Sequence, residues 1–515
     1  MRVVSATSQP VVASCVQARA APHGARRQAL SSHKCGLSLD APALRSASSS
    51  SRASSSSSEA IVEGSGAAAD GSSAQQADEK PPLQLTISIA SAMAHVGKDE
   101  WDVCAMGGDE VNPFLLYDFL SAMEDSKSAV REQGWQAQHV LVRNTSSGEL
   151  LGCAPMYLKA HSYGEYIFDN SWGNAYQRMT GQNYYPKLLV GVPFTPVTGQ
   201  RLLVKPGEQA GAVRRALADS LQQITDQFGV SSLHVNFVTP AEYQELGSRN
   251  GYLQRTGIQY HFYNSRNITA SMMDSMTSSS DSGEFSGMLS GVGGTGQDSM
   301  YSSFDGDEAS FLMNLRQSKR KSIRQERKKA KAEGLRFLRL TGADIKPHHW
   351  DAFYKFYRNT TDRKWGTPYL TKDFFHQLGE RMGDKVLLVL AESAEGAAGH
   401  GKPIAGALNL IGSHALFGRN WGCLYGDRVP NLHFELCYYS ALEFAIERGL
   451  QRVEAGAQGE HKLQRGYLPS FTHSVHYIPD PGFSGVVARY LHQERAEMDY
   501  TLEVLRREAS PYKQP

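Results

Sequence analysis

A helix followed by a strand is predicted from the segment Leu432-His-Phe-Glu-Leu-Cys-Tyr-Tyr-Ser-Ala-Leu-Glu-Phe-Ala-Ile-Glu-Arg-Gly-Leu-Gln-Arg-Val-Glu454. Its large apolar residues recur every three or four positions and therefore share one helical face. They are Leu432, Leu436, Tyr439, Leu442 and Ile446. Asn431 suits the N-cap of this helix, Glu435 suits its dipole, and Gly449 suits its end. The strand follows at Arg452-Val-Glu454.

The strand runs into a loop that is dense in charged residues, Ala455-Gly-Ala-Gln-Gly-Glu-His-Lys-Leu-Gln-Arg-Gly-Tyr467. With the strand end, it carries Glu454, Glu460, His461, Lys462 and Arg465 among three glycines. Glycines let the backbone approach a ligand, and functional residues concentrate in loops that a rigid scaffold holds. We therefore expect a ligand site here, with a solvated surface loop as the alternative.

The same order of elements occurs earlier in the chain. A helix is predicted before Gly229, and a strand follows it at 233–237. Its apolar face consists of Val213, Leu217, Leu221, Ile224 and Phe228. Each helix is preceded by a strand–turn–strand pair, 140–143 with 150–157 and 385–390 with 404–410. The repeat predicts an α/β (α+β) fold of two tandem units, each a mixed, mostly antiparallel sheet flanked by helices.

Composition divides the rest of the chain. From Leu83 the sequence alternates as a strand should, and a Ser-, Gly- and Met-rich tract interrupts the body near its middle. The expected regions are a transit peptide at 1–60, a disordered linker at 61–82, a first domain at 83–268, a disordered low-complexity insertion at 269–308, a basic helix at 309–333, a second domain at 334–480, and a C-terminal helix and tail at 481–515.

The first sixty residues have the composition of an organelle-targeting segment. They hold seven basic residues and two acids, and they are rich in Ser and Ala without a long apolar core. The run from Ser54 to Ser58 favours the chloroplast stroma, with the mitochondrion or an untargeted disordered tail as alternatives. The remaining chain holds 46 basic and 50 acidic residues and is mildly acidic.

The sequence gives no sign of a membrane span, a metal site or a disulfide framework. No apolar run approaches the roughly 20 residues that a spanning helix needs. The cysteines after residue 60 show no C-x-x-C spacing, so buried reduced thiols are expected. His433 and Glu435 could be metal ligands with His461, but their H-x-E spacing does not put both side chains on one helical face.

A strongly basic helix is predicted between the two units. Nine of the sixteen residues from Arg316 to Lys331 are Lys or Arg, and Glu326 alone is acidic. The stripe at steps of three or four consists of Arg316, Arg320, Arg324, Arg327 and Lys331. Such a stripe suits a nucleotide phosphate or an RNA backbone, and a solvated helix is the alternative.

In the first unit, a polar and aromatic segment is a candidate pocket wall for an amide or sugar ligand. It contains His161, Tyr163, Glu165 and Tyr166, which could equally be core residues with satisfied polar groups. Arg201, just after a loop that two prolines make rigid, could meet a phosphate or a carboxylate.

The two units resemble the Gcn5-related N-acetyltransferase (GNAT) fold, and the tandem arrangement is similar to the Fem-type aminoacyltransferases of bacterial peptidoglycan synthesis. Closer still is a bacterial and plastid family of GNAT-like proteins of the peptidoglycan biosynthesis/recognition type, across roughly residues 95–495. The matching segments are Asn112-Pro-Phe-Leu, His161-Ser-Tyr-Gly-Glu-Tyr166, Tyr185-Pro-Lys-Leu, Pro193-Phe-Thr-Pro-Val-Thr-Gly199, Lys319-Arg-Lys-Ser-Ile-Arg324, His433-Phe-Glu-Leu-Cys-Tyr-Tyr439 and Glu454-Ala-Gly-Ala-Gln-Gly-Glu-His-Lys462.

The resemblance implies transfer of an acyl or aminoacyl group to a small-molecule, peptide or glycan amine, with acyl-CoA or aminoacyl-tRNA as donor and no metal. Acyl transfer needs a base for the ammonium and a group that stabilises the oxyanion. Glu454, at a strand end, is the candidate base, with Glu460 and His461 as alternates. Lys462 matches the Fem-type lysine that follows the strand, which implies that it stabilises the oxyanion.

The candidate substrate-binding residues are His433, Glu435, Gln458, Arg465, Arg419, Trp421, His161, Tyr163, Glu165 and Tyr166. GNAT acetyltransferases hold the coenzyme A pyrophosphate with Q/R-x-x-G-x-G/A, which Arg419-Asn-Trp-Gly-Cys-Leu matches only in part. This departure favours the alternative function, a non-catalytic module that binds a glycan, a peptide or a phosphorylated ligand. The dense charged loop favours the enzyme.

Overall fold

The computed structural model describes residues 83–249, 251–264, 300–364, 368–393, 401–424, 429–456 and 459–513. The expected transit peptide and linker, and most of the expected insertion at 269–308, lie outside these ranges. The elements of the first half are β1 (Leu85–Ala90), α1 (Lys98–Ala105), α2 (Tyr117–Asp125), β2 (Trp135–Ala137), β3 (His139–Asn144), β4 (Leu150–Ala154), β5 (Met156–Lys159), α3 (Asn170–Thr180), β6 (Lys187–Val190), β7 (Leu203–Val204), α4 (Ala210–Phe228), β8 (Leu233–Val238), α5 (Pro240–Gly247) and β9 (Tyr252–Tyr263).

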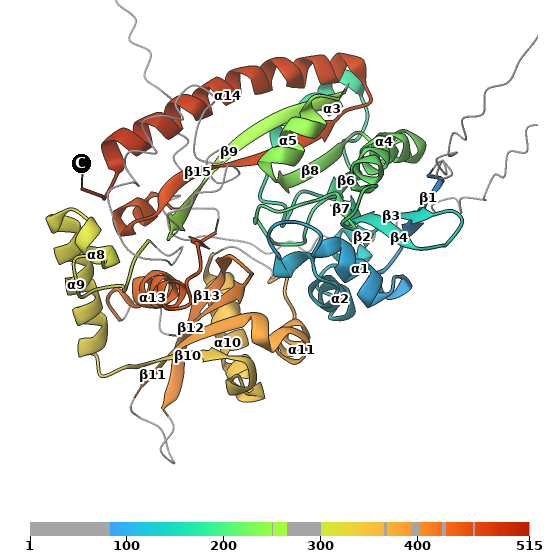
Figure 1. Cartoon of the computed structure of the whole chain (residues 1–515). Coiled ribbons are helices and arrows are strands. Elements are labelled where there is room, and N and C mark those ends of the chain that lie inside the picture. The colour runs from blue at the N-terminus through green and yellow to red at the C-terminus, as the bar shows by residue number, and fades with distance from the viewer. Residues whose placement is uncertain are drawn as a thin grey trace, which may run out of the picture. The chain divides into compact units, whose positions relative to one another are not determined.

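The second half begins with two helices, and a long helix closes it (Figure 1). Its elements are α8 (Phe311–Asn314), α9 (Gln317–Ala332), β10 (Arg336–Thr341), α10 (Pro347–Lys364), α11 (Lys372–Met382), β11 (Val386–Ser393), β12 (Lys402–Ile411), β13 (Ala415–Cys423), α12 (Leu432–Phe434), a π-helical turn (Glu435–Tyr439), α13 (Ser440–Glu447), β14 (Arg452–Glu454), the 3-10 helix η9 (Glu460–Arg465), β15 (Leu468–Tyr477) and α14 (Pro481–Ala509).

A large mixed sheet runs through both halves. Its strands lie in the order β10-β11-β12-β13-β14-β9-β15-β8-β6-β5-β2, and a separate sheet has the order β1-β3-β4-β7. Most neighbours are antiparallel, but β6 and β8 are parallel, as are β13 and β14. The predicted α/β fold with mixed, mostly antiparallel sheets is confirmed.

The two parallel pairs are the repeated unit. In the first half, α4 lies between β6 and β8 along the chain, and only residues 188–190 pair with 233–235. In the second half, α12 and α13 lie between β13 and β14, and only residues 415–417 pair with 452–454. In the first half, β6 ends at Val190, where its pairing with β8 stops. In the second half, β13 continues to Cys423, but its pairing with β14 stops at residue 417. The duplication predicted from the sequence is therefore present, and each copy has a place where two parallel neighbours diverge.

The strands of the two halves interlock. β15 lies between β8 and β9, and β9 also pairs with β14 through its last three residues. Helix α14 packs along β9 and β15, as Figure 1 shows in red. The junction between the halves is thus a continuous hydrogen-bonded sheet.

The helices bury the faces that the sequence predicted. Helix α4 buries Val213, Leu217, Leu221 and Ile224 against the sheet and ends at Gly229, whose φ of +60° favours glycine. Around β13, α10 covers one face of the sheet with Phe353 and Phe356, and α13 covers the other with Leu442 and its neighbours.

One local prediction is wrong. The expected strand at 150–157 is two strands in different sheets, because the chain breaks at Pro155, which has no N–H for a ladder. Asn431 occupies the N-cap position as predicted, but with a φ of +62° its side chain makes no cap bond to a described residue. The helix that follows contains a π-helical turn at Glu435–Tyr439, which periodicity alone does not reveal.

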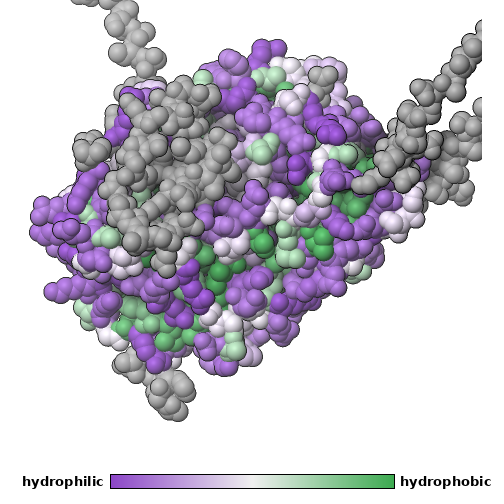
Figure 2. All heavy atoms as spheres, in the orientation of Figure 1, coloured by the Kyte–Doolittle hydropathy of each residue, from purple (hydrophilic) through white to green (hydrophobic). Residues whose placement is uncertain are grey.

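Within the described ranges, no helix is long and apolar enough to cross a membrane. On the face shown in Figure 2, hydrophilic residues predominate and hydrophobic ones form small groups.

Candidate functional site

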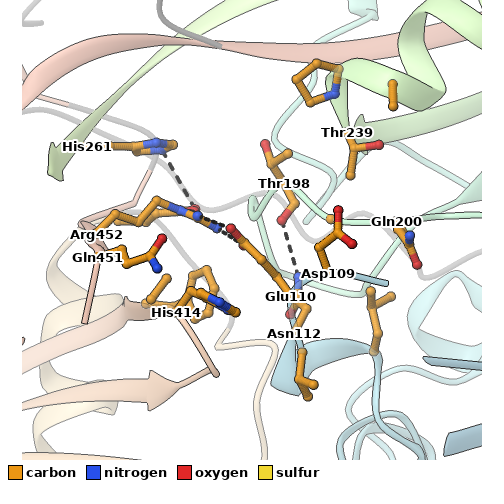
Figure 3. Close-up of a pocket in the computed structure, with 18 of the residues that line it drawn as sticks. Asp109, Glu110, Asn112, Thr198, Gln200, Thr239, His261, His414, Gln451 and Arg452 are labelled. Atoms are coloured by element: carbon orange, nitrogen blue, oxygen red, sulfur yellow. Dashed lines mark hydrogen bonds and ion pairs between the residues drawn. The ribbon is translucent and has the colours of Figure 1, made fainter. Parts of the chain in front are cut away.

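A cavity of about 400 Å³ lies between the two halves, on the sheet face opposite α13. We call it the central cavity. The first half contributes the loop that holds Glu110 and Asn112, residues 198–200 and the start of α5 at 239–241. The second half contributes the starts of β13 and β14 and a part of β15, and β9 adds His261 and Tyr263. Figure 3 shows Asp109 and Gln200 on one side of it and His261 and Arg452 on the other.

Arg452 on β14 joins the two halves electrostatically. Its Nε donates to Glu454 Oε1 at 2.8 Å, and its Nη1 and Nη2 donate to Glu110 Oε1 and Oε2 at 2.8 and 2.6 Å. Burial acts to raise the pKa of Glu110, but the hydrogen bonds and charge of Arg452 outweigh it and lower that pKa. Glu110 therefore stays ionised, and the guanidinium is fully occupied by two carboxylates.

Glu454 lines the central cavity and has one carboxylate oxygen, Oε2, without a hydrogen bond to a described residue. The residue is 2% exposed, and its Oε2 makes no hydrogen bond within the described part of the chain. The nearest basic group is His261 Nε2 at 3.7 Å. Burial lowers the pKa of His261 to about 4, although Glu454 acts to raise it. His261 is thus a neutral imidazole at pH 7, and Glu454 Oε2 is a carboxylate oxygen that can accept a proton.

His473 on β15 is a second polar group aimed into the cavity without a partner. It is 7% exposed, and neither ring nitrogen makes a hydrogen bond to another described residue. Burial lowers its pKa to about 4, so it is neutral at pH 7. A neutral imidazole always presents one acceptor nitrogen.

Lys462 lies in η9, after the end of β14, and is almost completely buried. Its Nζ donates to the carbonyl oxygen of Gly456 at 2.6 Å. Burial lowers the pKa of Lys462 to about 8, which the nearby Cys437 opposes. Glu454 and Lys462 are both buried at the same end of the sheet, but they do not form an ion pair with each other. The side chain of Glu460 and the whole of Gln458 lie outside the described residues.

The buried charge of Lys462 should make stability depend on pH. The unfolded lysine titrates near 10.4 and the folded one near 8, so the unfolded state binds more protons between these values, and the free energy of unfolding rises with pH there. Below pH 8 the penalty reaches about 3 kcal/mol, offset by about 1 kcal/mol for the hydrogen bond. We expect Lys462→Met to be more stable than the wild type at pH 7, and the difference to vanish near pH 10.

Urea unfolding at pH 7, 8, 9 and 10 measures this difference. The exposed Lys328 on α9 gives the control variant, Lys328→Met, whose stability relative to the wild type should not vary with pH. A Lys462→Met difference that is the same at every pH would contradict a buried ammonium.

A second cavity, of about 460 Å³, lies near the end of β13, between the start of α12 and the end of α10, which contributes Thr360 and Arg363. Trp421, His433 and Phe434 line it, and the rings of Trp421 and His433 meet edge to face at 5.1 Å. His461 packs on Phe434 and shares a 2.9 Å hydrogen bond with Tyr438. Three of the predicted residues, His433, Trp421 and His461, are thus brought together. We call the cavity that Trp421 and His433 line the helix-side cavity.

Other predicted residues hold the fold together. Arg465 donates to Glu326 at 2.9 and 3.0 Å and lies over the ring of Phe434. Glu435 is buried and accepts from Arg327, which also pairs with Glu443. Glu435 and Arg465 therefore satisfy charges of α9 and do not reach a cavity.

The arginine stripe on α9 is largely used by the protein itself. Arg316 donates to the carbonyl oxygen of Tyr512, Arg324 pairs with Asp305, and Arg327 is held as described. Arg320 has one nitrogen, Nη1, that is shielded and makes no hydrogen bond to a described residue. The exposed positive charge on this helix comes mainly from lysines, including Lys321, Lys328 and Lys329.

Arg419, on β13 beyond its pairing with β14, points toward the first half. It donates to Thr195 Oγ1 and lies over the rings of Phe114 and Phe119. Burial lowers its pKa to about 10, and its Nε and Nη2 make no hydrogen bond to described residues. Arg419, predicted to bind substrate, contacts the first half and lines neither the central nor the helix-side cavity.

The residues predicted to form a pocket wall in the first half have different surroundings and do not line one cavity together. Glu165 is buried and pairs with Lys187 at 2.8 Å, and Tyr163 is 75% exposed. His161 packs on Tyr163, and Tyr166 lines a third cavity of about 290 Å³ near α14. None of the four lines the central cavity. Arg201, also considered from the sequence, is buried and donates to backbone carbonyls, including that of Asn236 at 2.8 Å.

Sequence reasoning missed the residues that complete the central cavity, Glu110, His261, Arg452 and His473. A signal was present, because Gln259, His261 and Tyr263 alternate along β9 and so share one face of the sheet. Glu110, which lines the cavity from the first half, could not be found from the sequence, because it lies in a loop 342 residues before Arg452.

Comparisons with known proteins agree with this architecture. A family model for FemAB-like proteins, described as peptidoglycan biosynthesis/recognition, matches residues 92–275 and 295–514. No curated protein matches the chain.

Among solved structures, FemX is 12% identical over 76% of this chain and 99% of its own, with a TM-score of 0.43. A tandem GNAT protein from the clavulanic acid biosynthesis pathway is 12% identical over 77% and 99%, with a TM-score of 0.38. L-PGS from Bacillus licheniformis is 11% identical over 75% and 98%, with a TM-score of 0.39.

Proposed function

Because this chain belongs to the FemAB-like family of peptidoglycan biosynthesis/recognition proteins, with two tandem GNAT-like domains, we propose that it transfers an acyl or aminoacyl group to an amine. Family membership supports a transferase in general terms. The finer proposal concerns the groups that carry out the transfer and the cavities from which donor and acceptor approach.

The observation that carries the proposal is the free oxygen of Glu454. It sits at the end of β14, where β13 and β14 diverge, and faces the central cavity. Arg452 fixes the other oxygen of the carboxylate, so the orientation of Oε2 is held in advance. A positioned carboxylate of this kind can take the proton that an ammonium must lose before its nitrogen attacks.

The proposed reaction is an ordinary acyl transfer. The amine nitrogen attacks the donor carbonyl carbon, a C–N bond forms, and the C–S bond of a thioester or the C–O bond of an aminoacyl ester breaks. One ammonium proton passes to Glu454, directly or through a water molecule, and then to the departing thiolate or alkoxide. The second proton, which the nitrogen loses as the amide forms, is released to water.

The two cavities suggest how donor and acceptor approach. Both cavities are lined by β13, the central cavity by Ala415 and Phe417 and the helix-side cavity by Trp421 and Cys423, and β13 pairs with β14 over residues 415–417. We assign the donor, acyl-CoA or aminoacyl-tRNA, to the helix-side cavity with Trp421 and His433, and the amine to the central cavity. The exposed lysines of α9 would contact the phosphates of either donor. The composition of residues 1–60 supports a chloroplast location as part of this proposal.

A label-transfer assay tests the proposal. The purified protein is incubated with a radiolabelled acyl-CoA or aminoacyl-tRNA and with a panel of amines that includes UDP-linked muropeptide, and labelled amide is measured by chromatography. We expect time-dependent amide formation with one donor class. Binding of donors and amines in a thermal-shift screen without any transfer would favour the non-catalytic module instead.

A further inference from the structure

We propose that the acceptor held in the central cavity is a small diamine, with one positive charge besides the reacting nitrogen and with no phosphate. This inference rests on the proposed function, since it names the class of amine. It differs from a nucleotide-linked acceptor, whose diphosphate would bring negative charge into the same space.

The charges of the lining residues favour a cation. Three carboxylates, Asp109, Glu110 and Glu454, line the cavity with one guanidinium, Arg452, so the carboxylates outnumber the guanidinium by two. Arg452 is bound to two of these carboxylates and offers no free cation to a phosphate. Lys462 is directed to the carbonyl of Gly456 and is not among the lining residues. A cleft lined by one sign of charge attracts the opposite sign and repels its own.

Two buried groups independently point to a hydrogen-bond donor. Glu454 Oε2 and the ring of His473 are shielded from solvent and have no hydrogen-bond partner among the described residues. Buried polar groups are nearly always satisfied, so a ligand that completes this site should supply N–H donors. An ammonium has three donors and no acceptor, which matches Glu454 Oε2 and the one acceptor nitrogen of the neutral His473 imidazole.

The positions of the carboxylates call for two ammonium groups. Glu454 lies on β14 and shares Arg452 with Glu110, whereas Asp109 lies on the other side of the cavity from Arg452 (Figure 3). Asp109 is exposed at the rim and Glu454 is buried. A short diamine would place its reacting nitrogen near Glu454 and its second ammonium near Asp109. A volume of about 400 Å³ suits such a molecule.

Isothermal titration calorimetry of the full protein, without donor, tests the proposal. The probes are 1,5-diaminopentane, its mono-N-acetyl derivative and UDP-linked muropeptide, at 20 and 300 mM salt. We expect the diamine to bind at least about tenfold more tightly than the monoamine, and its affinity to fall as salt rises.

Asp109→Asn should weaken diamine binding about three- to tenfold at low salt and much less at high salt. Asp99→Asn is the matched control, because Asp99 is an exposed aspartate on α1 that does not line the cavity. Equal binding of diamine and monoamine, no effect of Asp109→Asn, or binding of the muropeptide alone would each overturn the inference.

The failure of this inference can be told from the failure of the proposed function. A diamine that binds through Asp109 but is never acylated supports the cationic site and contradicts the transferase. Labelled amide formed on the muropeptide, together with no diamine binding, supports the transferase and contradicts the cationic site.

Discussion

Glu454→Gln should lower the rate of acyl transfer by a factor of about 10² to 10⁴, the range that a positioned general base contributes. The amide keeps the shape of the side chain and an oxygen that can accept from Arg452 Nε, which Glu454 holds at 2.8 Å. It cannot take a proton from an ammonium. The variant should therefore remain folded, with a change of less than about 2 kcal/mol in the free energy of unfolding, and bind donor normally.

The measurement is the initial rate of amide formation with saturating donor, from pH 6 to 9. Glu447→Gln is the matched control, because Glu447 is a half-exposed carboxylate that pairs with Arg339 on the surface. Its rate should equal that of the wild type. A Glu454→Gln enzyme with an unchanged rate and pH profile would remove Glu454 as the base and leave His461 as the next candidate.

Lys187→Met should destabilise the protein by about 3–5 kcal/mol, the cost of breaking a buried ion pair from one side. Lys187 is fully buried, and its Nζ contacts Glu165 Oε2 at 2.8 Å and also Asp169. Burial acts to lower the pKa of Lys187, but these two carboxylates raise it. Without the ammonium, both carboxylates would stay in the interior beside Lys159, which lies 4.0 Å from Glu165 and whose pKa burial lowers to about 7.

Urea unfolding at pH 7.5 measures the loss, and Lys205→Met is the control, since Lys205 pairs with Glu149 at the surface and should matter by less than about 1 kcal/mol. Adding Glu165→Gln to Lys187→Met should recover part of the loss. A Lys187→Met loss as small as that of the control would show that the buried cluster does not need its cation.

Most of the fold could be predicted, because it depends on local patterns. The face of α4 and its end at Gly229 follow from side-chain spacing and from the left-handed backbone that glycine tolerates. The duplication followed from the order of such elements. The π-helical turn at Glu435–Tyr439 was not predicted, because side-chain periodicity does not reveal it. The break at Pro155 was missed although proline, which lacks a backbone N–H, is a local signal for it.

Only the part of the candidate site on β14 and the loop that follows it could be predicted from the sequence. Glu454 and Lys462 could be found because they lie in one charged, glycine-rich loop. Their surroundings depend on pairings between distant segments, such as Arg452 with Glu110 and β14 with β9. A single sequence carries no record of such pairings. The same limit explains why Arg327 could be read as a phosphate ligand, although it is bound to Glu435 and Glu443.

The position of β15 between β8 and β9 has a mechanical consequence. Two domains joined by a flexible linker could move apart to admit a substrate. Here such a movement would break the backbone hydrogen bonds that β15 makes with β8 and β9. Cutting the polypeptide between residues 264 and 300 would likewise strip each fragment of strands that it borrows from the other. Substrate entry should therefore depend on movements of side chains and loops, and we expect the two repeats to unfold together.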